Sequence, residues 1–117
     1  MVRRDTFEKV VAKDYQIVET VEKLLEEIQN NLYNRAKKLL QENITTVGNY
    51  EEFKQMLKEK GGFIRASWCN NSKCEQKIKE ETGATIRIVP FDREEPFDQC
   101  LCCGAQAEEV VYFARAY

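Results

Sequence analysis

The chain has 117 residues, a formal net charge of −2 and 43% hydrophobic residues. This length predicts one domain, or one domain with a piece of another, and the composition is sufficient for a small hydrophobic core. The balanced charge argues against a surface that coats nucleic acid. No apolar run approaches about 18 residues, and the N-terminus lacks the apolar segment of a secretory signal, so neither a membrane partner nor secretion is expected.

The first half of the chain predicts mainly helix. Residues 1–13 are short and mixed, and the β-prone Val10 and Val11 suit a strand or the end of a hairpin. Residues 14–43 predict one long helix with Asp14 as its N-cap. Its apolar residues recur at three- and four-residue steps: Ile17, Val21, Leu24, Leu25, Ile28, Leu32, Ala36 and Leu39.

A second helix is predicted after a short strand or loop at residues 44–48. Asn49 and Glu52 have the spacing of a capping box, which places the start of the helix there. Gly61 and Gly62 end it, because glycine readily adopts the conformation that follows a helix C-terminus. The two glycines do not form a phosphate-binding loop, since the rest of that motif is missing.

The second half predicts strands around a third helix. Three β-prone runs predict strands at residues 63–68, 85–89 and 110–114. Ser72 and Glu75 have the spacing of a second capping box, which begins a helix that runs to Thr82. An acidic loop is expected at residues 91–99. Strands set among helices in this order favour an α/β (α+β) two-layer sandwich, with a mixed sheet and helices packed on one face.

All five cysteines lie in the second half, in two short-spaced groups. Cys69 and Cys74 form C-x4-C, and Cys100 and Cys103 form C-x2-C-G with Cys102 between them. Four thiolates in two such pairs suit a tetrahedral zinc site. The predicted ligands are therefore Cys69, Cys74, Cys100 and Cys103, and Cys102 remains the alternative to one of the last pair.

The rest of the composition narrows the role of these cysteines. Histidine is absent, which excludes sites that need an imidazole base and leaves zinc without nitrogen ligands from the protein. The odd number of cysteines and the lack of a secretory signal argue against a disulfide framework. Two alternatives stay open: buried free thiols, and a redox pair at Cys100 and Cys103, although redox motifs usually open a helix. A closed four-thiolate site has no open position for substrate, so the metal is predicted to be structural.

From Gly61 onward the sequence resembles the C-terminal domain of prolyl-tRNA synthetase, of the archaeal and eukaryotic type that also occurs in some bacteria. The resemblance is carried by GGFIRASWC at 61–69, KCEQKIKEETGATIRIVPF at 73–91, CLCCG at 100–104 and VVYFARAY at 110–117. The long helix fits the same domain, so the resemblance covers residues 14–117. Residues 1–13 resemble the end of an anticodon-binding domain, and the chain would then be a piece of a full synthetase.

This resemblance implies a function and partners. The parent would be a cytoplasmic, homodimeric class II synthetase, a proline–tRNA ligase that joins proline to tRNA(Pro) with ATP. Its ATP, proline and anticodon contacts lie in earlier domains, so this chain would be non-catalytic and support them. Similar domains hold zinc through four cysteines that map onto Cys69, Cys74, Cys100 and Cys103. Some relatives have C-x-C in the last pair, which keeps Cys102 open.

The resemblance also implies details of the fold. It predicts a β-α-β-α-β-β order, similar to the C-domain of initiation factor 3, with a zinc knuckle. It further implies that Tyr117 ends the chain with a carboxylate that approaches the active site of the full enzyme. A freestanding zinc-binding adaptor that contacts RNA or protein is the alternative function, and a thiol redox module is the third.

Overall fold

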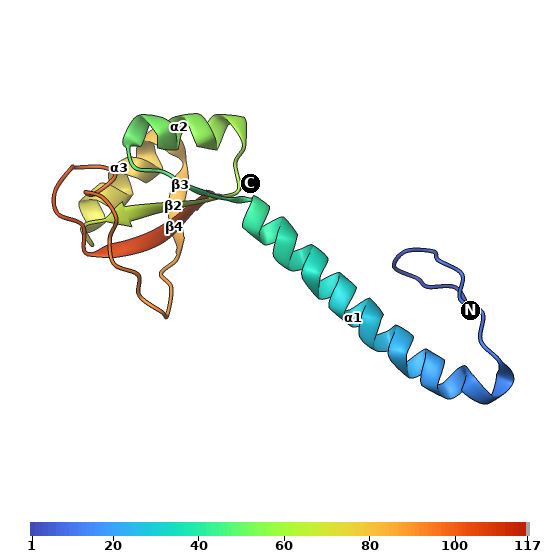
Figure 1. Ribbon diagram of the computed structural model, residues 1–117. Helices are drawn as coiled ribbons and strands as arrows, with labels where there is room; N and C mark the ends of the chain where they lie inside the picture. Colours follow the sequence, from blue (N-terminus) through green and yellow to red (C-terminus); the bar gives the residue numbers. More distant parts are fainter. Residues whose placement is uncertain (117) are drawn as a thin grey trace. The chain divides into compact units, whose positions relative to one another are not determined.

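The computed structural model describes residues 1–116, and Tyr117 lies outside the described residues. The chain divides into two compact units, Met1–Gln41 and Glu42–Tyr117. Figure 1 colours the first unit from blue to cyan and the second from green to red. Within residues 1–116, no helix combines the length and the apolar character that crossing a membrane requires.

The first unit begins with a short hairpin. Val2 and Lys9 form an antiparallel bridge, and Val10 donates its backbone N–H to the carbonyl of Met1 at 2.9 Å. The hairpin end expected near Val10 is therefore present, although its pairing is limited to this single bridge and its flanking hydrogen bonds.

A buried carboxylate ties this hairpin to the long helix. Asp5 accepts hydrogen bonds from the guanidinium of Arg3 at 3.1 and 3.0 Å and from the amide of Asn31 at 2.6 Å. These two donors stabilise the charged form, and they hold the pKa of the Asp5 carboxyl well below its ordinary value. Charge-assisted hydrogen bonds thus join the hairpin to the helix within this unit.

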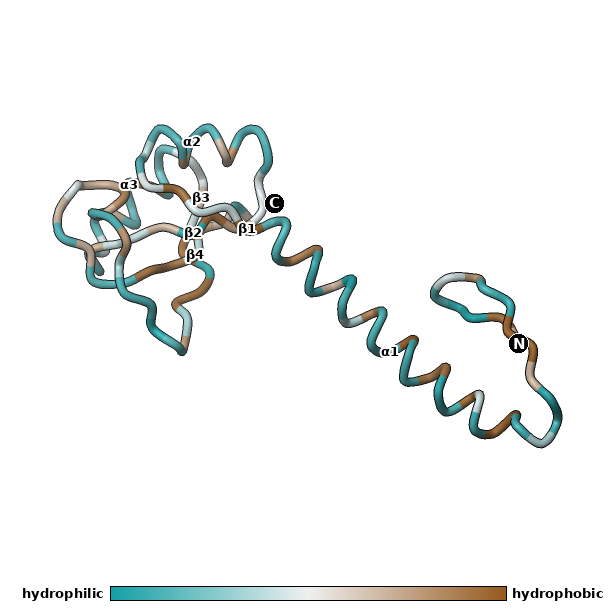
Figure 2. The backbone as a smooth tube through the Cα atoms, in the orientation of Figure 1, coloured by the Kyte–Doolittle hydropathy of each residue, from teal (hydrophilic) through white to brown (hydrophobic). Residues whose placement is uncertain are grey.

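The long helix α1 spans Ile17–Glu42 and follows a 3-10 turn, η1, at Asp14–Gln16. The prediction of Asp14 as N-cap is wrong, because this residue lies inside η1. Lys13 precedes the turn and makes no side-chain cap bond. None of the α1 residues is buried within the chain, and Figure 2 shows apolar and polar residues alternating along the helix.

The second unit is a mixed four-stranded sheet with two helices. Its elements in chain order are β1 (Ile44–Thr46), α2 (Tyr50–Glu59), β2 (Phe63–Trp68), α3 (Ser72–Thr82), β3 (Ala84–Ile88) and β4 (Glu109–Arg115). The strands lie in the order β1-β2-β4-β3. β1 runs parallel to β2, whereas β4 runs antiparallel to both of its neighbours. The α+β class, the mixed sheet and the β-α-β-α-β-β order are confirmed.

One face of the sheet forms the core against α2 and α3. Ile64 on β2 is paired with Phe113 on β4, so their side chains project from the same face. Phe53 of α2 meets Phe113 edge-on, with ring centroids 5.3 Å apart. Ile78 of α3 joins the same buried cluster. Burying each such side chain contributes roughly 1.5–3 kcal/mol, so this layer supplies most of the apolar stabilisation of the unit.

The opposite face of the sheet is partly covered by the loop between β3 and β4. Arg65 of β2 forms an ion pair with Glu94, and its guanidinium lies 4.7 Å from the ring centroid of Phe97. The backbone N–H of Asp98 donates to the hydroxyl of Ser67 at 3.3 Å. The predicted acidic loop therefore contacts β2 directly and leads the chain toward the knuckle of cysteines.

The helix starts confirm one sequence prediction and correct another. Asn49 caps α2, since its side chain accepts from the N–H of Glu52 at 2.9 Å. At α3 the cap is Asn71, which accepts from the N–H of Lys73 at 2.9 Å, and not Ser72 as predicted. Ser72 is the first residue of the helix itself.

Candidate metal centre

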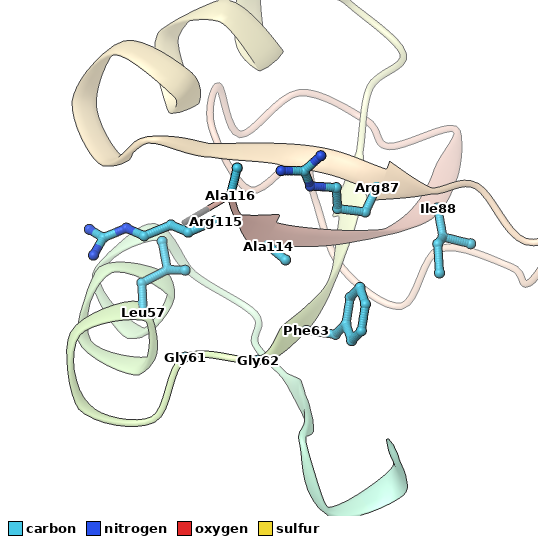
Figure 3. Close-up of a pocket in the computed structure, with 9 residues that line it drawn as sticks. All are labelled: Leu57, Gly61, Gly62, Phe63, Arg87, Ile88, Ala114, Arg115 and Ala116. Carbon is cyan, nitrogen blue, oxygen red and sulfur yellow. The ribbon is translucent and has the colours of Figure 1, made fainter. Parts of the chain in front are cut away.

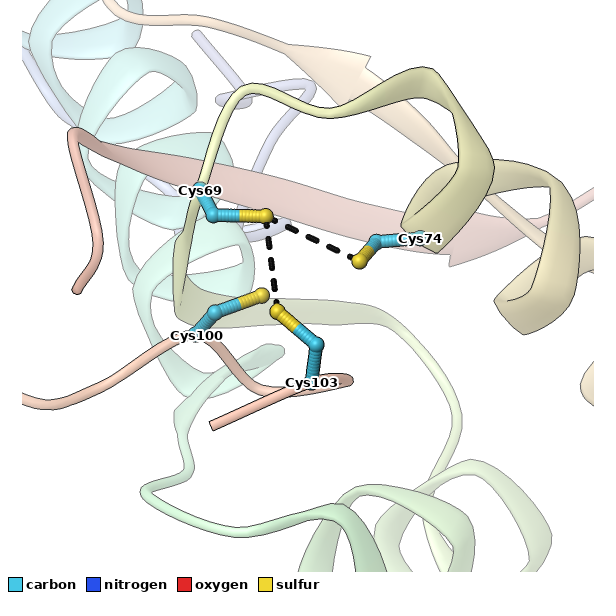
Figure 4. Close-up of side chains that lie close together, drawn as sticks. All are labelled: Cys69, Cys74, Cys100 and Cys103. Carbon is cyan, nitrogen blue, oxygen red and sulfur yellow. Dashed lines mark hydrogen bonds between the residues drawn. The ribbon is translucent and has the colours of Figure 1, made fainter. Parts of the chain in front are cut away.

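Four of the five cysteines come together at one end of the sheet. Cys69 directly follows β2, Cys74 lies in the first turn of α3, and Cys100 and Cys103 belong to the loop that precedes β4. Figure 4 shows the four side chains pointing toward one another from these separate segments. Their sulfur atoms all lie within 4.8 Å of one another. The geometry therefore brings together the four residues that the spacing singled out.

The distances between the sulfurs fit a tetrahedral ion. The Sγ atoms of Cys69 and Cys74 are 3.6 Å apart, and those of Cys69 and Cys103 are 3.7 Å apart. An ion about 2.3 Å from each of four sulfurs, the usual zinc–sulfur length, places them about 3.8 Å apart at the corners of a tetrahedron. Covalent disulfides require about 2.05 Å, and all five cysteines are free thiols. The donor set suits zinc, and an all-thiolate tetrahedron also suits iron.

The loop at Cys100 is a knuckle that aims backbone N–H groups at a sulfur. The chain turns back through a hydrogen bond from the N–H of Gly104 to the carbonyl of Cys100 at 3.0 Å, and Gly104 has φ +70°. Burial opposes ionisation of the Cys100 thiol, but hydrogen bonds from the backbone N–H groups of Cys103 and Cys102, joined by hydrogen bonds from Cys69, outweigh it. Together they lower the pKa of Cys100 to about 7. The knuckle thus stabilises a thiolate before any metal is considered.

A second, smaller turn follows Cys69. Asn70 adopts a left-handed conformation with φ +55°, which Asn tolerates better than most residues. This turn lets the backbone N–H of Asn71 reach the sulfur of Cys69. Burial still dominates and raises the pKa of the Cys69 thiol, with the Asn71 N–H acting in the opposite direction. Burial also raises the pKa of Cys74. A divalent cation at the centre would reverse these preferences, because a coordinating thiol is deprotonated outright.

Backbone hydrogen bonds from the sheet hold the knuckle in place. The N–H of Leu101 donates to the carbonyl of Ser67 at 3.0 Å, and the N–H of Glu108 donates to the carbonyl of Trp68 at 2.8 Å. The side chain of Leu101 is buried in the core cluster. The knuckle is therefore attached to β2 by contacts that do not depend on a metal. The pattern of cysteines gave no sign of these anchoring residues, because their contacts are made by backbone groups.

Cys102 has a different environment from the other four. It lies outside the group whose sulfurs converge, and it is half-buried against the hydrophobic core. Burial raises the pKa of its thiol. Of the two arrangements left open by the spacing, the structure places Cys103 beside Cys69, Cys74 and Cys100. The other residue singled out from the sequence, Tyr117, lies outside the described residues.

A cavity elsewhere in the same unit has no cysteine in its lining. It has a volume of about 540 Å³ and lies beside the C-terminal end of β4, lined by Leu57, Gly61, Gly62, Phe63, Arg87, Ile88, Ala114, Arg115 and Ala116. Figure 3 shows that these side chains point in several directions rather than converging. The lining contains neither a carboxylate nor a thiol, so it offers no acid, base or nucleophile for catalysis.

Comparison with known proteins identifies the family. The family model of the prolyl-tRNA synthetase C-terminal region matches residues 50–117. The chain belongs to this family. A proline–tRNA ligase 2 of Bacillus cereus is 47% identical over the whole of this chain, which covers 25% of that protein. A proline–tRNA ligase of Oceanobacillus iheyensis is 46% identical over the whole chain, which covers 24% of that protein.

Solved structures agree with the sequence comparison. The crystal structure of prolyl-tRNA synthetase from Cryptosporidium parvum, complexed with L-proline and AMP, matches 99% of this chain and 25% of its own chain. The match has a TM-score of 0.89 at 32% identity. The chain thus spans about a quarter of the length of the relatives that it matches. Its likeness to the synthetase family extends over both compact units, whereas the family model covers the second unit from the start of α2.

Proposed function

We propose that this chain is the structural zinc-binding part of a proline–tRNA ligase and contributes no catalytic group of its own. Residues 14–117 are its C-terminal zinc-binding domain, and residues 1–13 are the end of the anticodon-binding domain. The observation that carries the proposal is the convergence of four free thiols within 4.8 Å in a chain of this family. Four protein ligands fill a tetrahedral zinc, so the ion has no open position for water or substrate.

The contribution of this chain is then mechanical. Bound zinc would link the end of β2, the first turn of α3 and the knuckle, through Cys69, Cys74, Cys100 and Cys103. Structural zinc in small peptides contributes roughly 10–16 kcal/mol of apparent binding free energy, which is large beside the core of a unit this size. The chain's own residues prepare the site: the N–H groups of Cys102 and Cys103 support the sulfur of Cys100, and that of Asn71 supports Cys69.

The remaining partners belong to the full-length enzyme. In this proposal ATP, proline and tRNA(Pro) bind to domains that precede this chain, and the enzyme is a cytoplasmic homodimer. Tyr117 is assigned the role of bringing a terminal carboxylate toward that active site. The support for this larger proposal is the match of the whole chain to proline–tRNA ligases at 47% identity.

Metal analysis of serine variants tests the ligand set. The freshly purified protein should contain about one zinc per chain by inductively coupled plasma mass spectrometry. Cys103→Ser should lose most of it, because a hydroxyl is a poor substitute for a thiolate, whereas Cys102→Ser should keep it. Zinc retained in Cys103→Ser and lost in Cys102→Ser would overturn the choice of the fourth ligand. A protein without bound metal would overturn the zinc proposal altogether.

Aminoacylation by the full-length protein that carries this chain tests the ligase context. It should attach radiolabelled proline to tRNA(Pro) in the presence of ATP. The Cys74→Ser form should unfold at a lower temperature than the wild type but keep the affinity of the wild type for proline. The reason is that the cysteines stabilise a domain and do not touch the substrate. Failure of the wild-type protein to charge tRNA(Pro) would favour a zinc-binding adaptor instead.

A further inference from the structure

The four converging thiols are unequally exposed to solvent. Cys74 and Cys100 are buried, with 8% and 3% of their surface accessible. Cys69 is half-buried, and Cys103 is exposed. A small oxidant that arrives from solvent therefore reaches Cys103 before any other cysteine of the centre. Once it is coordinated to a metal, this sulfur is a thiolate, which is the form that oxidants attack.

We propose that Cys103 is the point at which a peroxide oxidises this centre, and that Cys69 then forms a disulfide with Cys103 and releases the metal. This inference rests on the proposed zinc-binding function. It assigns a modification site and a resolving partner within a set of residues whose structural role is to hold the ion. The centre is then a switch between a metal-bound reduced state and a metal-free oxidised state.

The chemistry balances with hydrogen peroxide as the only added reactant. The thiolate of Cys103 attacks one peroxide oxygen, the O–O bond breaks, hydroxide leaves, and Cys103 becomes a sulfenic acid. The thiolate of Cys69 then attacks the sulfur of Cys103, the S–O bond breaks, and a second hydroxide leaves. Two thiolates have lost two electrons in total, and the peroxide has gained them. The metal is left with two of its four ligands, and its affinity falls accordingly.

Geometry favours Cys69 as the resolving thiol. Its sulfur lies 3.7 Å from that of Cys103, and the dashed line in Figure 4 joins the two. Cys69 also lies 3.6 Å from Cys74, but Cys74 is buried and Cys69 is half-buried, so an oxidant from solvent reaches the exposed Cys103 before either of them. Cys100 is more deeply buried than Cys69, with 3% of its surface accessible, which leaves Cys69 the better placed of the two to react at Cys103. Cys102 is the immediate neighbour of Cys103, and a disulfide between adjacent residues is sterically strained.

The oxidised state would be reversible. A disulfide between Cys69 and Cys103 keeps the end of β2 attached to the knuckle, where a backbone hydrogen bond already joins Ser67 to Leu101. The oxidised unit therefore retains part of its structure while it lacks the metal. A thiol reductant would restore both sulfurs by thiol–disulfide exchange, and added zinc would then bind again.

The experiment follows zinc release and disulfide formation in the same sample. Zinc-loaded protein is treated with stoichiometric hydrogen peroxide, released zinc is read with a chromogenic chelator, and remaining thiols are blocked by alkylation at each time. Trypsin cleaves after Lys73, so Cys69 and Cys74 fall on different peptides, while the later cysteines share the peptide that follows Arg93. Fragmentation of the cross-linked peptide then identifies the partner of Cys69. We expect the Cys69–Cys103 bond to appear at the same rate as zinc is released.

Cys102→Ser is the matched control, because it removes a thiol without removing one of the four converging sulfurs. Its zinc release and its first disulfide should equal those of the wild type, and dithiothreitol with added zinc should reverse both. A first disulfide at any other pair, or zinc that stays bound until Cys103 reaches the sulfinic acid, would sink the inference while leaving the zinc proposal intact. A protein that never held zinc would fail the proposed function instead, so the two failures are distinguishable.

Discussion

The junction between Asn43 and Gly62 shows how a single position constrains the second unit. The carbonyl of Asn43 accepts the N–H of Phe63 at 2.9 Å, which brings the start of β1 beside the start of β2. A Cβ atom on Gly62 would lie 2.5 Å from that carbonyl oxygen, and Gly62 has φ +76°. Gly61, one residue earlier, has φ +67°, but a Cβ atom added there would have nothing within 4 Å. Two neighbouring glycines therefore have different reasons to be glycine.

This contrast yields a prediction. Gly61→Ala should lower the free energy of unfolding by roughly 1 kcal/mol, the cost of a left-handed alanine. Gly62→Ala should lower it by about 1–3 kcal/mol more, because a methyl group meets a backbone oxygen that cannot move without breaking the pairing of β1 and β2. Urea denaturation of the zinc-loaded variants, followed by the fluorescence of Trp68, measures both. Equal losses would show that the clash with Asn43 is relieved at little cost.

At the scale of elements, the start of α3 depends on more than the local sequence. Asn71 and Ser72 are both good N-cap residues, and the capping-box spacing to Glu75 favours Ser72. The structure uses Asn71, whose side chain accepts the N–H of Lys73, and the residue before it, Asn70, makes the left-handed turn that follows Cys69. The helix thus begins one residue earlier than the capping-box spacing predicts, directly after the turn that follows Cys69.

Alanine substitutions at the two positions distinguish the caps. Asn71→Ala should destabilise the protein by about 1 kcal/mol, because the N–H of Lys73 loses its acceptor. Ser72→Ala should change stability by less than about half of that, since alanine is a better helix former within the first turn. Thermal unfolding of the zinc-loaded proteins gives the comparison, and zinc content should stay at the wild-type level in both variants because the backbone N–H groups remain. A larger loss of stability in Ser72→Ala than in Asn71→Ala would support Ser72 as the N-cap, as the sequence predicted.

Local patterns predicted the helices and strands well, because each depends on residues close in the chain. The predicted helix of residues 14–43 and strand of residues 63–68 correspond to α1 and β2. The strand order was not predictable in this way. The order of elements along the chain puts β4 last but carries no sign that it lies between β2 and β3, since strand pairing is a long-range property. The cover that the loop provides over Arg65 was missed for the same reason.

More of the candidate metal site than of the strand order could be predicted from the sequence. Cysteine spacing favoured the four residues that converge, because C-x4-C and C-x2-C are both common spacings for zinc ligands. It did not decide between Cys102 and Cys103, which depends on the direction in which each side chain leaves the knuckle. That direction is set by the turn at Gly104 and by the bond between Leu101 and Ser67.

At the scale of the whole molecule, metal removal should affect the two units differently. All five cysteines lie in the second unit, so a chelator should increase amide hydrogen exchange across residues 67–106. Peptides from α1 serve as an internal reference, because the first unit contains no cysteine. Hydrogen exchange followed by mass spectrometry, with and without chelator, makes the measurement. Unchanged exchange at the knuckle after complete zinc removal would show that backbone and apolar contacts alone hold this region.

The position of β4 has a consequence for synthesis on the ribosome. β4 is the last strand along the described chain, yet it pairs with both β2 and β3. The ribosome therefore makes β2 and β3 before β4, the strand that lies between them in the sheet. It likewise makes Cys69 and Cys74 before the cysteines of the knuckle. Sheet completion and metal capture then occur within the same late interval. The edges of β2 and β3 that pair with β4 therefore stay exposed until β4 itself has been made, whether or not zinc is bound.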